Sequence, residues 1–245
     1  MPKNINSASR LYSLFERTLG EPDNTQILEV WAKLLGVSES NANRKAALVS
    51  ERLRWMHREL ELVAEQMRES GYSENLYAKA ILNIEHAMSA MILPATWNQA
   101  KQYLGSDTLL ALAFCSEILP DEESQISADE LREIQALVDE LRSSLSASEL
   151  PSRLVALIQH HVELIQRALA EYPITGAKAL REAARTGLGE LIEVKETVRA
   201  SRDTPEISKL VTAWKKVNEV ADIAFKSEKL AQLGQKAWAA LENFL

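Results

Sequence analysis

Cysteine and histidine are scarce in this 245-residue chain, which carries one cysteine and four histidines. The single cysteine, Cys115, excludes a disulfide within the chain and lies in the apolar run LLALAFC. We expect a buried, unreactive thiol in a reducing environment. No Glu-x-x-His pair of the kind used by di-iron helical bundles is present. His160 and His161 are adjacent, so on a helix they point about 100° apart and cannot hold one metal ion. The sequence therefore predicts no metal site and no cofactor.

Long hydrophobic runs are also missing. The longest strongly apolar stretch, residues 109–115, is far shorter than the roughly 18 residues that a membrane-spanning helix requires. The first ten residues, MPKNINSASR, lack the apolar segment of a secretory signal, so we expect a cytoplasmic protein. The eight glycines form no phosphate-binding loop, and no serine lies in a nucleophile motif. An enzyme with a site that one sequence does not reveal is therefore only a third hypothesis for function.

Strand-like patterns are absent, and seven prolines separate the helical ones. Proline breaks a helix internally but is tolerated in the first turn. All seven fall between apolar-periodic stretches, where a helix would begin or end: Pro2, Pro22, Pro94, Pro120, Pro151, Pro173 and Pro205. We therefore predict an all-α protein, a multi-helix bundle of about nine or ten helices.

Capping residues and apolar spacing locate these helices. Asn6 or Ser7 is predicted to cap the first helix, and the segment Ser127-Ala-Asp-Glu130 matches a capping box. The longest predicted helix begins at Ser38, and its apolar residues from Ala42 to Met67 alternate at intervals of four and three. Such spacing is typical of a coiled-coil-like seam.

The first half of the chain contains two further apolar stripes. Residues 73–91 are predicted to form one helix with these side chains aligned: Leu76, Ala80, Ile84, Ala87 and Met91. Pro94 is predicted to begin a short helix that extends through Tyr103. The helix after it carries apolar residues at intervals of four: Leu110, Phe114 and Ile118. Each stripe predicts a helix with one apolar face.

In the second half, Pro151 is predicted to begin a helix that ends at Tyr172-Pro173, with His161 facing inward. Residues 174–198 are predicted to form a return helix. Gly187 and Gly189 in this helix would allow a bend or a close approach of another helix.

Pro120 and the polar run that follows it form the best candidate linker, residues 120–126. It would separate an N-terminal helical bundle, residues 1–119, from a C-terminal one, residues 127–245, although a single domain also fits. In the C-terminal part a heptad pattern runs from Ile207 to Ala224 and resumes from Leu230 to Leu241, which predicts a kink or a short break between two helices.

The net charge of −7 is concentrated in one stretch. Residues 117–149 contain ten acidic residues and two basic ones. Because nucleic-acid binding needs a positive surface, this balance disfavours a nucleic-acid partner. It favours instead a surface for a basic protein partner, with a solvated linker and helix cap as the alternative. The candidate partner surface comprises Glu122, Glu123, Asp129, Glu130, Glu133, Asp139 and Glu140.

The segment Trp31-Ala-Lys-Leu-Leu-Gly-Val-Ser38 resembles the first helix and turn of a helix-turn-helix. The resemblance weakens afterwards, because Ala42 and Lys45 fall where that motif usually has larger apolar residues, and the predicted second helix is unusually long. A DNA-binding regulator that uses residues 27–58 is therefore the alternative hypothesis. Its candidate DNA contacts are Arg44, Lys45 and Arg52.

Four segments resemble uncharacterised bacterial all-helical proteins, some of which are encoded near phage-defence or toxin-type genes. The segments are LPSRL at 150–154 with ALAEYPITG at 168–176, ALREA at 179–183, and ILEVWAK at 27–33. The resemblance implies a bacterial cytosolic protein and an accessory role in antiviral defence, and it brings no catalytic residues. Our main hypothesis is a non-enzymatic helical subunit or adaptor that binds a protein partner, as a hetero- or homo-oligomer, and does not bind a membrane.

Overall fold

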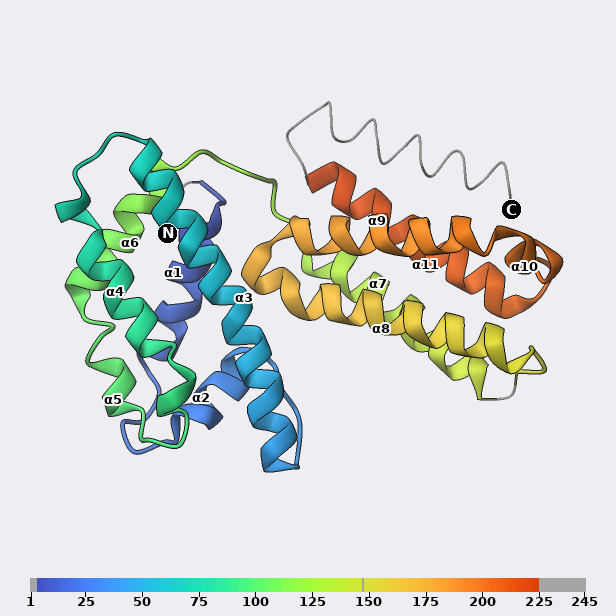
Figure 1. Ribbon diagram of the computed structural model, residues 1–245, viewed down its shortest axis with the longest axis horizontal. Helices are drawn as coiled ribbons and strands as arrows, with labels where there is room; N and C mark the ends of the chain where they lie inside the picture. Colours follow the sequence, from blue (N-terminus) through green and yellow to red (C-terminus); the bar gives the residue numbers. More distant parts are fainter. Residues whose placement is uncertain (1–3, 147, 225–245) are drawn as a thin grey trace. The chain divides into compact units, whose positions relative to one another are not determined.

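The computed structural model describes residues 4–146 and 148–224. The chain divides into two compact units (Figure 1). Unit 1 comprises Met1–Glu122 and Pro173–Thr175, and unit 2 comprises Glu123–Tyr172 and Gly176–Leu245. The division after Glu122 falls inside the segment that the sequence marks as a linker. The predicted helix from Leu230 to Leu241 lies outside the described residues.

The described residues are mostly helical, and the only β-type pairing among them is one isolated bridge. The all-α prediction is therefore confirmed. Eleven α-helices are present in these residues, more than the predicted nine or ten; the predicted return helix of residues 174–198 is divided into two of them, α9 and α10. Their bounds are α1 (Ser7–Thr18), α2 (Ile27–Leu34), α3 (Ala42–Glu69), α4 (Ala78–Ala87), α5 (Asn98–Lys101), α6 (Ser106–Ile118), α7 (Ala128–Leu145), α8 (Ser152–Thr175), α9 (Ala177–Glu193), α10 (Lys195–Ala200) and α11 (Pro205–Ala224). Two 3₁₀ turns flank α4, namely η1 (Glu74–Leu76) and η2 (Ala90–Ile92).

Capping explains several helix starts. The side chain of Asn6 accepts a hydrogen bond from the amide of Ser9, and Ser127 does the same for Glu130; both form reciprocal capping boxes. The predicted start of the long helix at Ser38 is wrong. Helix α3 begins at Ala42, because Asn41 is the residue whose side chain caps it.

Two of the proline predictions are also wrong. Pro173 lies inside α8, which continues to Thr175 and ends at Gly176, a glycine with a φ of 70°. The nitrogen of Pro173 carries no hydrogen, so α8 lacks one amide donor at this position. Pro94 does not begin a helix; a turn follows it, and only Asn98–Lys101 are helical before α6.

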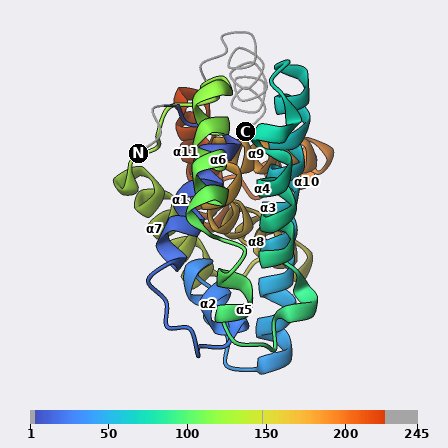
Figure 2. The ribbon, with the colours of Figure 1, turned by 90° about the vertical axis from the view of Figure 1, so that its left-hand side faces the viewer.

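Unit 1 has its core between α1, α2, α3 and α6, and Figure 2 shows this unit from the side on which α4 and α6 lie. Trp31 and Trp97 are fully buried at its centre and meet edge to face, with ring centroids 5.5 Å apart. Phe15 meets Trp31 in the same way at 6.1 Å. Aromatic residues from three separate segments therefore fix how this core packs.

Unit 2 has a second core, in which α11 packs against both α7 and α9. Its centre is the buried Trp214 of α11. Gly187 of α9 lies directly against this indole, since a Cβ built on it would be 2.3 Å from Trp214 Cζ2. The predicted close approach is confirmed at Gly187. At Gly189 a Cβ would meet nothing within 4 Å, so only the first glycine serves helix packing.

Candidate interaction surfaces

Glu123 does not belong to an exposed acidic surface, contrary to the sequence prediction. Its side chain is buried, and its Oε2 accepts a hydrogen bond of 2.6 Å from the backbone amide of Ala177. This amide is at the N-terminus of α9, where the helix dipole favours a carboxylate. A Cβ on Gly176 would lie 2.1 Å from Glu123 Oε1, so glycine at that position makes room for the cap. Glu123 therefore stabilises unit 2 internally.

Glu122 is also engaged within its own unit. Its Oε2 lies 2.9 Å from Arg10 Nη2, which is equally close to Glu59 Oε2. Ser7 donates a 2.7 Å hydrogen bond to the same Glu59 oxygen. These groups form a largely buried polar cluster in unit 1, so the Glu122 carboxylate is not available as a contact for a basic partner.

The other five predicted carboxylates lie on α7, where several already have partners from this chain. Arg132 pairs with Asp129, and Lys216 of α11 lies 2.6 Å from Glu133. Of the remaining three, Glu130 accepts a hydrogen bond from the amide of Ser127 in the capping box of α7. Asp139 accepts a hydrogen bond from Gln135, and Glu140 is exposed. The acidic excess of this surface is therefore smaller than the local sequence charge suggests.

The region that resembles a helix-turn-helix departs from that motif. Seven residues, 35–41, separate α2 from α3. In a helix-turn-helix the turn between the two helices has about three or four residues. Two of the three candidate DNA contacts bind within the chain: Lys45 Nζ lies 2.9 Å from Glu29 Oε1, and Arg52 donates to the carbonyl oxygen of Leu35. Arg44 is exposed. Of the three predicted contacts, these interactions leave only Arg44 for phosphate.

The histidines do not assemble with acidic residues into a metal centre in the described part of the chain. His161 is fully buried, as predicted, and meets Trp214 edge to face. Burial lowers its pKa to about 4, although Glu190 partly offsets this effect. His160 is at the surface, with its Nε2 3.0 Å from Glu190 Oε2.

Cys115 is buried, as the sequence predicts, and burial raises its pKa to about 11. A thiol with this pKa is almost entirely protonated at neutral pH. Since the thiolate is the reactive form, this cysteine is not a candidate nucleophile.

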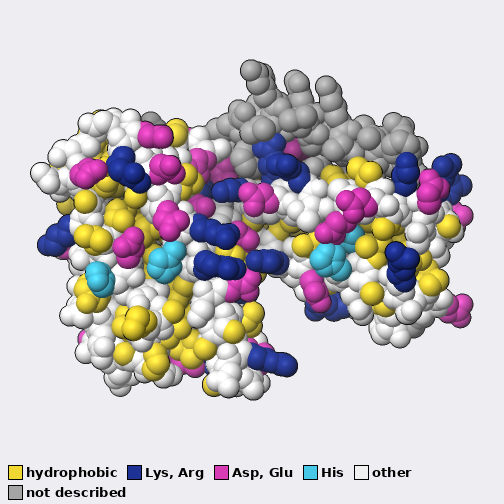
Figure 3. Space-filling view, viewed as in Figure 1, with side chains coloured by type: hydrophobic (Ala, Val, Ile, Leu, Met, Phe, Trp, Pro, Cys, Tyr) yellow, Lys and Arg dark blue, Asp and Glu magenta, His cyan; other side chains and the backbone are white. Residues whose placement is uncertain are grey.

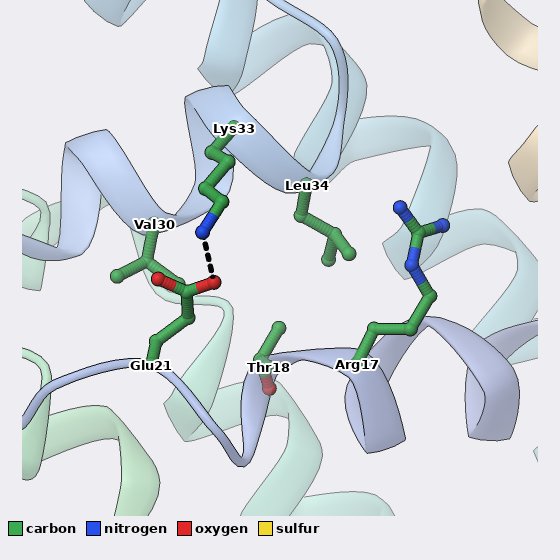
Figure 4. A pocket seen from close by; sticks show the side chains of 6 residues that line it. All are labelled: Arg17, Thr18, Glu21, Val30, Lys33 and Leu34. Atoms are coloured by element: carbon green, nitrogen blue, oxygen red, sulfur yellow. Dashed lines mark hydrogen bonds and ion pairs between the residues drawn. The ribbon is translucent and has the colours of Figure 1, made fainter.

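A pocket of about 250 Å³ opens between the end of α1 and α2 (Figure 4). It is lined by Arg17, Thr18, Glu21, Val30, Lys33 and Leu34. Lys33 Nζ lies 2.6 Å from Glu21 Oε1, so two of its three charged side chains neutralise each other. The pocket is smaller than the roughly 300–1,000 Å³ of most small-molecule sites, and we assign no ligand to it.

Helix α6 is apolar on two opposite sides. One side packs into the core and is buried, with Leu109, Leu112 and Cys115. Of the stripe that the sequence spacing selects, Leu110 lies on the other side and is 72% exposed, whereas Phe114 and Ile118 are half-buried and pack against the core. A helix that is apolar all round is normally covered all round. Within the described residues, nothing covers Leu110.

The predicted stripe of residues 73–91 is divided in the same region. Helix α4 is confined to Ala78–Ala87 because the chain bends into a 3₁₀ turn at each end. The central residues of the stripe are buried, but Leu76 is 51% and Met91 90% exposed. Leu82, on the outer side of α4, is 55% exposed. Figure 3 shows apolar side chains among the charged ones on the visible side of unit 1.

Helices α4 and α6 lie side by side and run antiparallel (Figure 2). Tyr72 meets Phe114 edge to face with ring centroids 5.6 Å apart, and Lys79 Nζ lies 3.8 Å from Asp107 Oδ2. Leu76 and Leu110 each lie between these two contacts in the sequence of their own segments, and both side chains are exposed. We define this α4–α6 face by Tyr72, Leu76, Lys79, Leu82, Asp107, Leu110 and Phe114. Sequence spacing missed it, although the run LLALAFC already indicates a helix that is apolar on more than one side.

Two further observations concern the chain as a whole. None of the described helices has both the length and the apolar character that crossing a membrane requires. The resemblance to bacterial all-helical proteins rests on its sequence motifs alone and stays a prediction. The chain matches no protein-family model, no curated protein and no solved structure.

Proposed function

We propose that this chain is a non-enzymatic helical subunit that binds another protein through the α4–α6 face. The observation that supports the proposal is the large exposure of Leu110 on the outer side of α6. The inner sides of α4 and α6 already pack into the core of unit 1. Full burial of an exposed leucine is worth about 1.5–3 kcal/mol. Leu76 and Leu82 extend the same surface, so a partner would bury several large apolar side chains at once.

The chemistry of the face indicates what kind of partner it suits. Its lysine and aspartate, Lys79 and Asp107, pair with each other, and the exposed Glu74, Glu85 and Glu117 lie on the same segments. A partner that contacts this face needs an apolar surface of matching shape at the leucines. This differs from the acidic-surface hypothesis, which the internal partners of Glu122, Glu123 and Glu133 have weakened.

Site-specific photo-crosslinking in the native host tests the proposal. A photoreactive amino acid replaces Leu110 in one variant, and the exposed Leu48 of α3 is replaced as the matched control in unit 1. A third variant carries the photoreactive group in place of Glu140 and reports on the acidic surface of α7. We expect a discrete protein adduct from position 110 and none from position 48.

The three positions separate the alternatives. An adduct from position 140 alone would move the contact to α7 and support the acidic-surface hypothesis. The absence of any adduct at position 110, with the variant folded and expressed, would contradict the proposal.

A further inference from the structure

We infer that Arg10 is a latch for the last turn of α8, and that this turn opens locally when the latch is broken while the rest of unit 1 stays folded. The turn comprises Pro173–Thr175, which belongs to unit 1. Its residue Ile174 lies in the core of that unit and is 1% exposed. The Nε of Arg10 donates a 3.1 Å hydrogen bond to the carbonyl oxygen of Ile174. A side chain of α1 therefore holds a turn that lies 164 residues further along the chain.

Arg10 provides what the sequence at the end of α8 does not. The last four carbonyl groups of a helix have no partner within that helix, and a cation near them interacts favourably with the helix dipole. The last turn of α8 contains no basic residue. The guanidinium of Arg10 supplies both a donor for one of these carbonyl groups and a positive charge beside it. Loss of this contact should therefore weaken the end of α8 directly.

The backbone on either side of the turn favours local opening. Pro173 has no amide hydrogen, so the bond to the preceding turn of α8 is missing at this position. Gly176 follows the turn with a φ of 70°, in the left-handed region that favours glycine. Local opening requires the least free energy where a segment has few contacts to lose. We therefore expect the contacts of Ile174 to decide whether the turn stays in place.

Two carboxylates orient the guanidinium toward this turn. Arg10 Nη2 lies 2.9 Å from Glu59 Oε2 and 2.9 Å from Glu122 Oε2, while Nε remains directed at Ile174. Arginine can make these contacts together because its donors lie in one rigid plane, whereas the ammonium group of lysine is a single point charge. A lysine at position 10 would pair with a carboxylate but would have no donor in place of Nε.

Amide hydrogen exchange of the full chain under native conditions tests the inference, with the amides of residues 174–176 as probes. In Arg10→Lys these amides should exchange at least about tenfold faster, since a hydrogen bond to a charged group is lost. The amides of α3 and α6 should change little, because lysine keeps a positive charge beside Glu59. Arg17→Lys is the matched control, since Arg17 is exposed on the same helix, and it should leave residues 174–176 unchanged.

A second variant tests the turn without altering Arg10 or its carboxylates. Ile174→Ala removes most of the buried side chain that anchors the turn, so residues 174–176 should again exchange at least about tenfold faster. This variant keeps the test decisive if Arg10→Lys does not fold.

Two outcomes would overturn the inference. The first is unchanged exchange of residues 174–176 in a folded Arg10→Lys chain or in Ile174→Ala. The second is an equal acceleration in α1, α3 and α6, because unit 1 would then open as a whole.

Discussion

Arg10 and Glu59 form an ion pair inside unit 1, with 2.9 Å between Arg10 Nη2 and Glu59 Oε2. Both side chains are almost completely shielded from solvent. Burying two charges costs several kcal/mol each, and this cost is offset only while each charge keeps its partners. Glu59 also accepts a hydrogen bond from the hydroxyl group of Ser7, the first residue of α1. The pair therefore contributes to the stability of the unit that carries the α4–α6 face.

Substitution of Glu59 by glutamine should destabilise unit 1 by about 3 kcal/mol. The side chain keeps its size but loses its charge, which leaves the buried Arg10 with a weaker set of partners. Urea unfolding followed by tryptophan fluorescence measures the change. Glu133→Gln is the matched control, because it breaks the ion pair with Lys216 at the surface of unit 2 and should change stability by about 0.5 kcal/mol or less. Equal effects of the two substitutions would contradict this account.

Gly187→Ala should destabilise unit 2. The added methyl group would lie 2.3 Å from Cζ2 of Trp214, so either the indole or α9 has to move. Overpacking of this kind costs about 1–3 kcal/mol, which outweighs a gain of about 1 kcal/mol in helix propensity. Urea unfolding followed by circular dichroism measures the loss.

The neighbouring glycine provides the control. Gly189→Ala adds a methyl group with open space around it, so it should stabilise α9 by up to about 1 kcal/mol. Opposite signs for the two substitutions are expected. Stabilisation by both would show that Gly187 is not held close to Trp214.

Unit 2 should lose stability as the pH falls from about 7 to 4, because His161 is buried in its neutral form. Above pH 7 the imidazole is neutral in both the folded and the unfolded chain and makes no pH-dependent contribution. Below the unfolded pKa of 6.5 the unfolded chain takes up a proton, whereas the folded pKa is about 4. The free energy of unfolding should therefore fall by about 2 kcal/mol between pH 7 and pH 5.

Urea unfolding at pH 7 and pH 5 measures this loss. His161→Leu should remove it, since leucine has a similar volume and cannot be protonated. His160→Gln, a change at the surface, should leave the pH dependence largely unchanged. The same pH dependence in wild type and His161→Leu would assign the effect to other groups.

Duplex DNA should not bind at micromolar protein and physiological salt. Lys45 is paired with Glu29, Arg52 donates to the carbonyl of Leu35, and the chain has a net negative charge. Fluorescence anisotropy with a labelled duplex measures binding. Saturable, salt-sensitive binding that the double variant Arg44→Ala, Lys45→Ala abolishes would support the DNA-binding hypothesis instead.

The helices were predictable where local chemistry decides them. The capping box at Ser127, a cap at Asn6 or Ser7 and the burial of His161 follow from residue spacing alone. Helix ends that depend on tertiary contacts did not follow. Pro173 lies inside α8 instead of ending it. The segment after Pro94 consists mainly of turns, so the presence of this proline alone does not predict where a helix begins.

The surfaces were harder to predict than the helices, because spacing shows that a stripe is apolar but not which side is buried. On α6 the stripe through Leu110 and Phe114 and the one through Leu109 and Leu112 are both regular, and only the packing against α1 and α4 distinguishes them. Burial of Glu123 is a similar case. Its partner, the amide of Ala177, lies 54 residues away in sequence, so no local signal marks it.

Amide hydrogen exchange of the complex against the free chain tests whether the α4–α6 face is the contact surface. Peptides that cover residues 72–87 and 106–118 should exchange more slowly in the complex, whereas peptides from α7 and from the α2–α3 connection should be unchanged. Slower exchange confined to α7 or to residues 35–45, with none in α4 or α6, would contradict the claim.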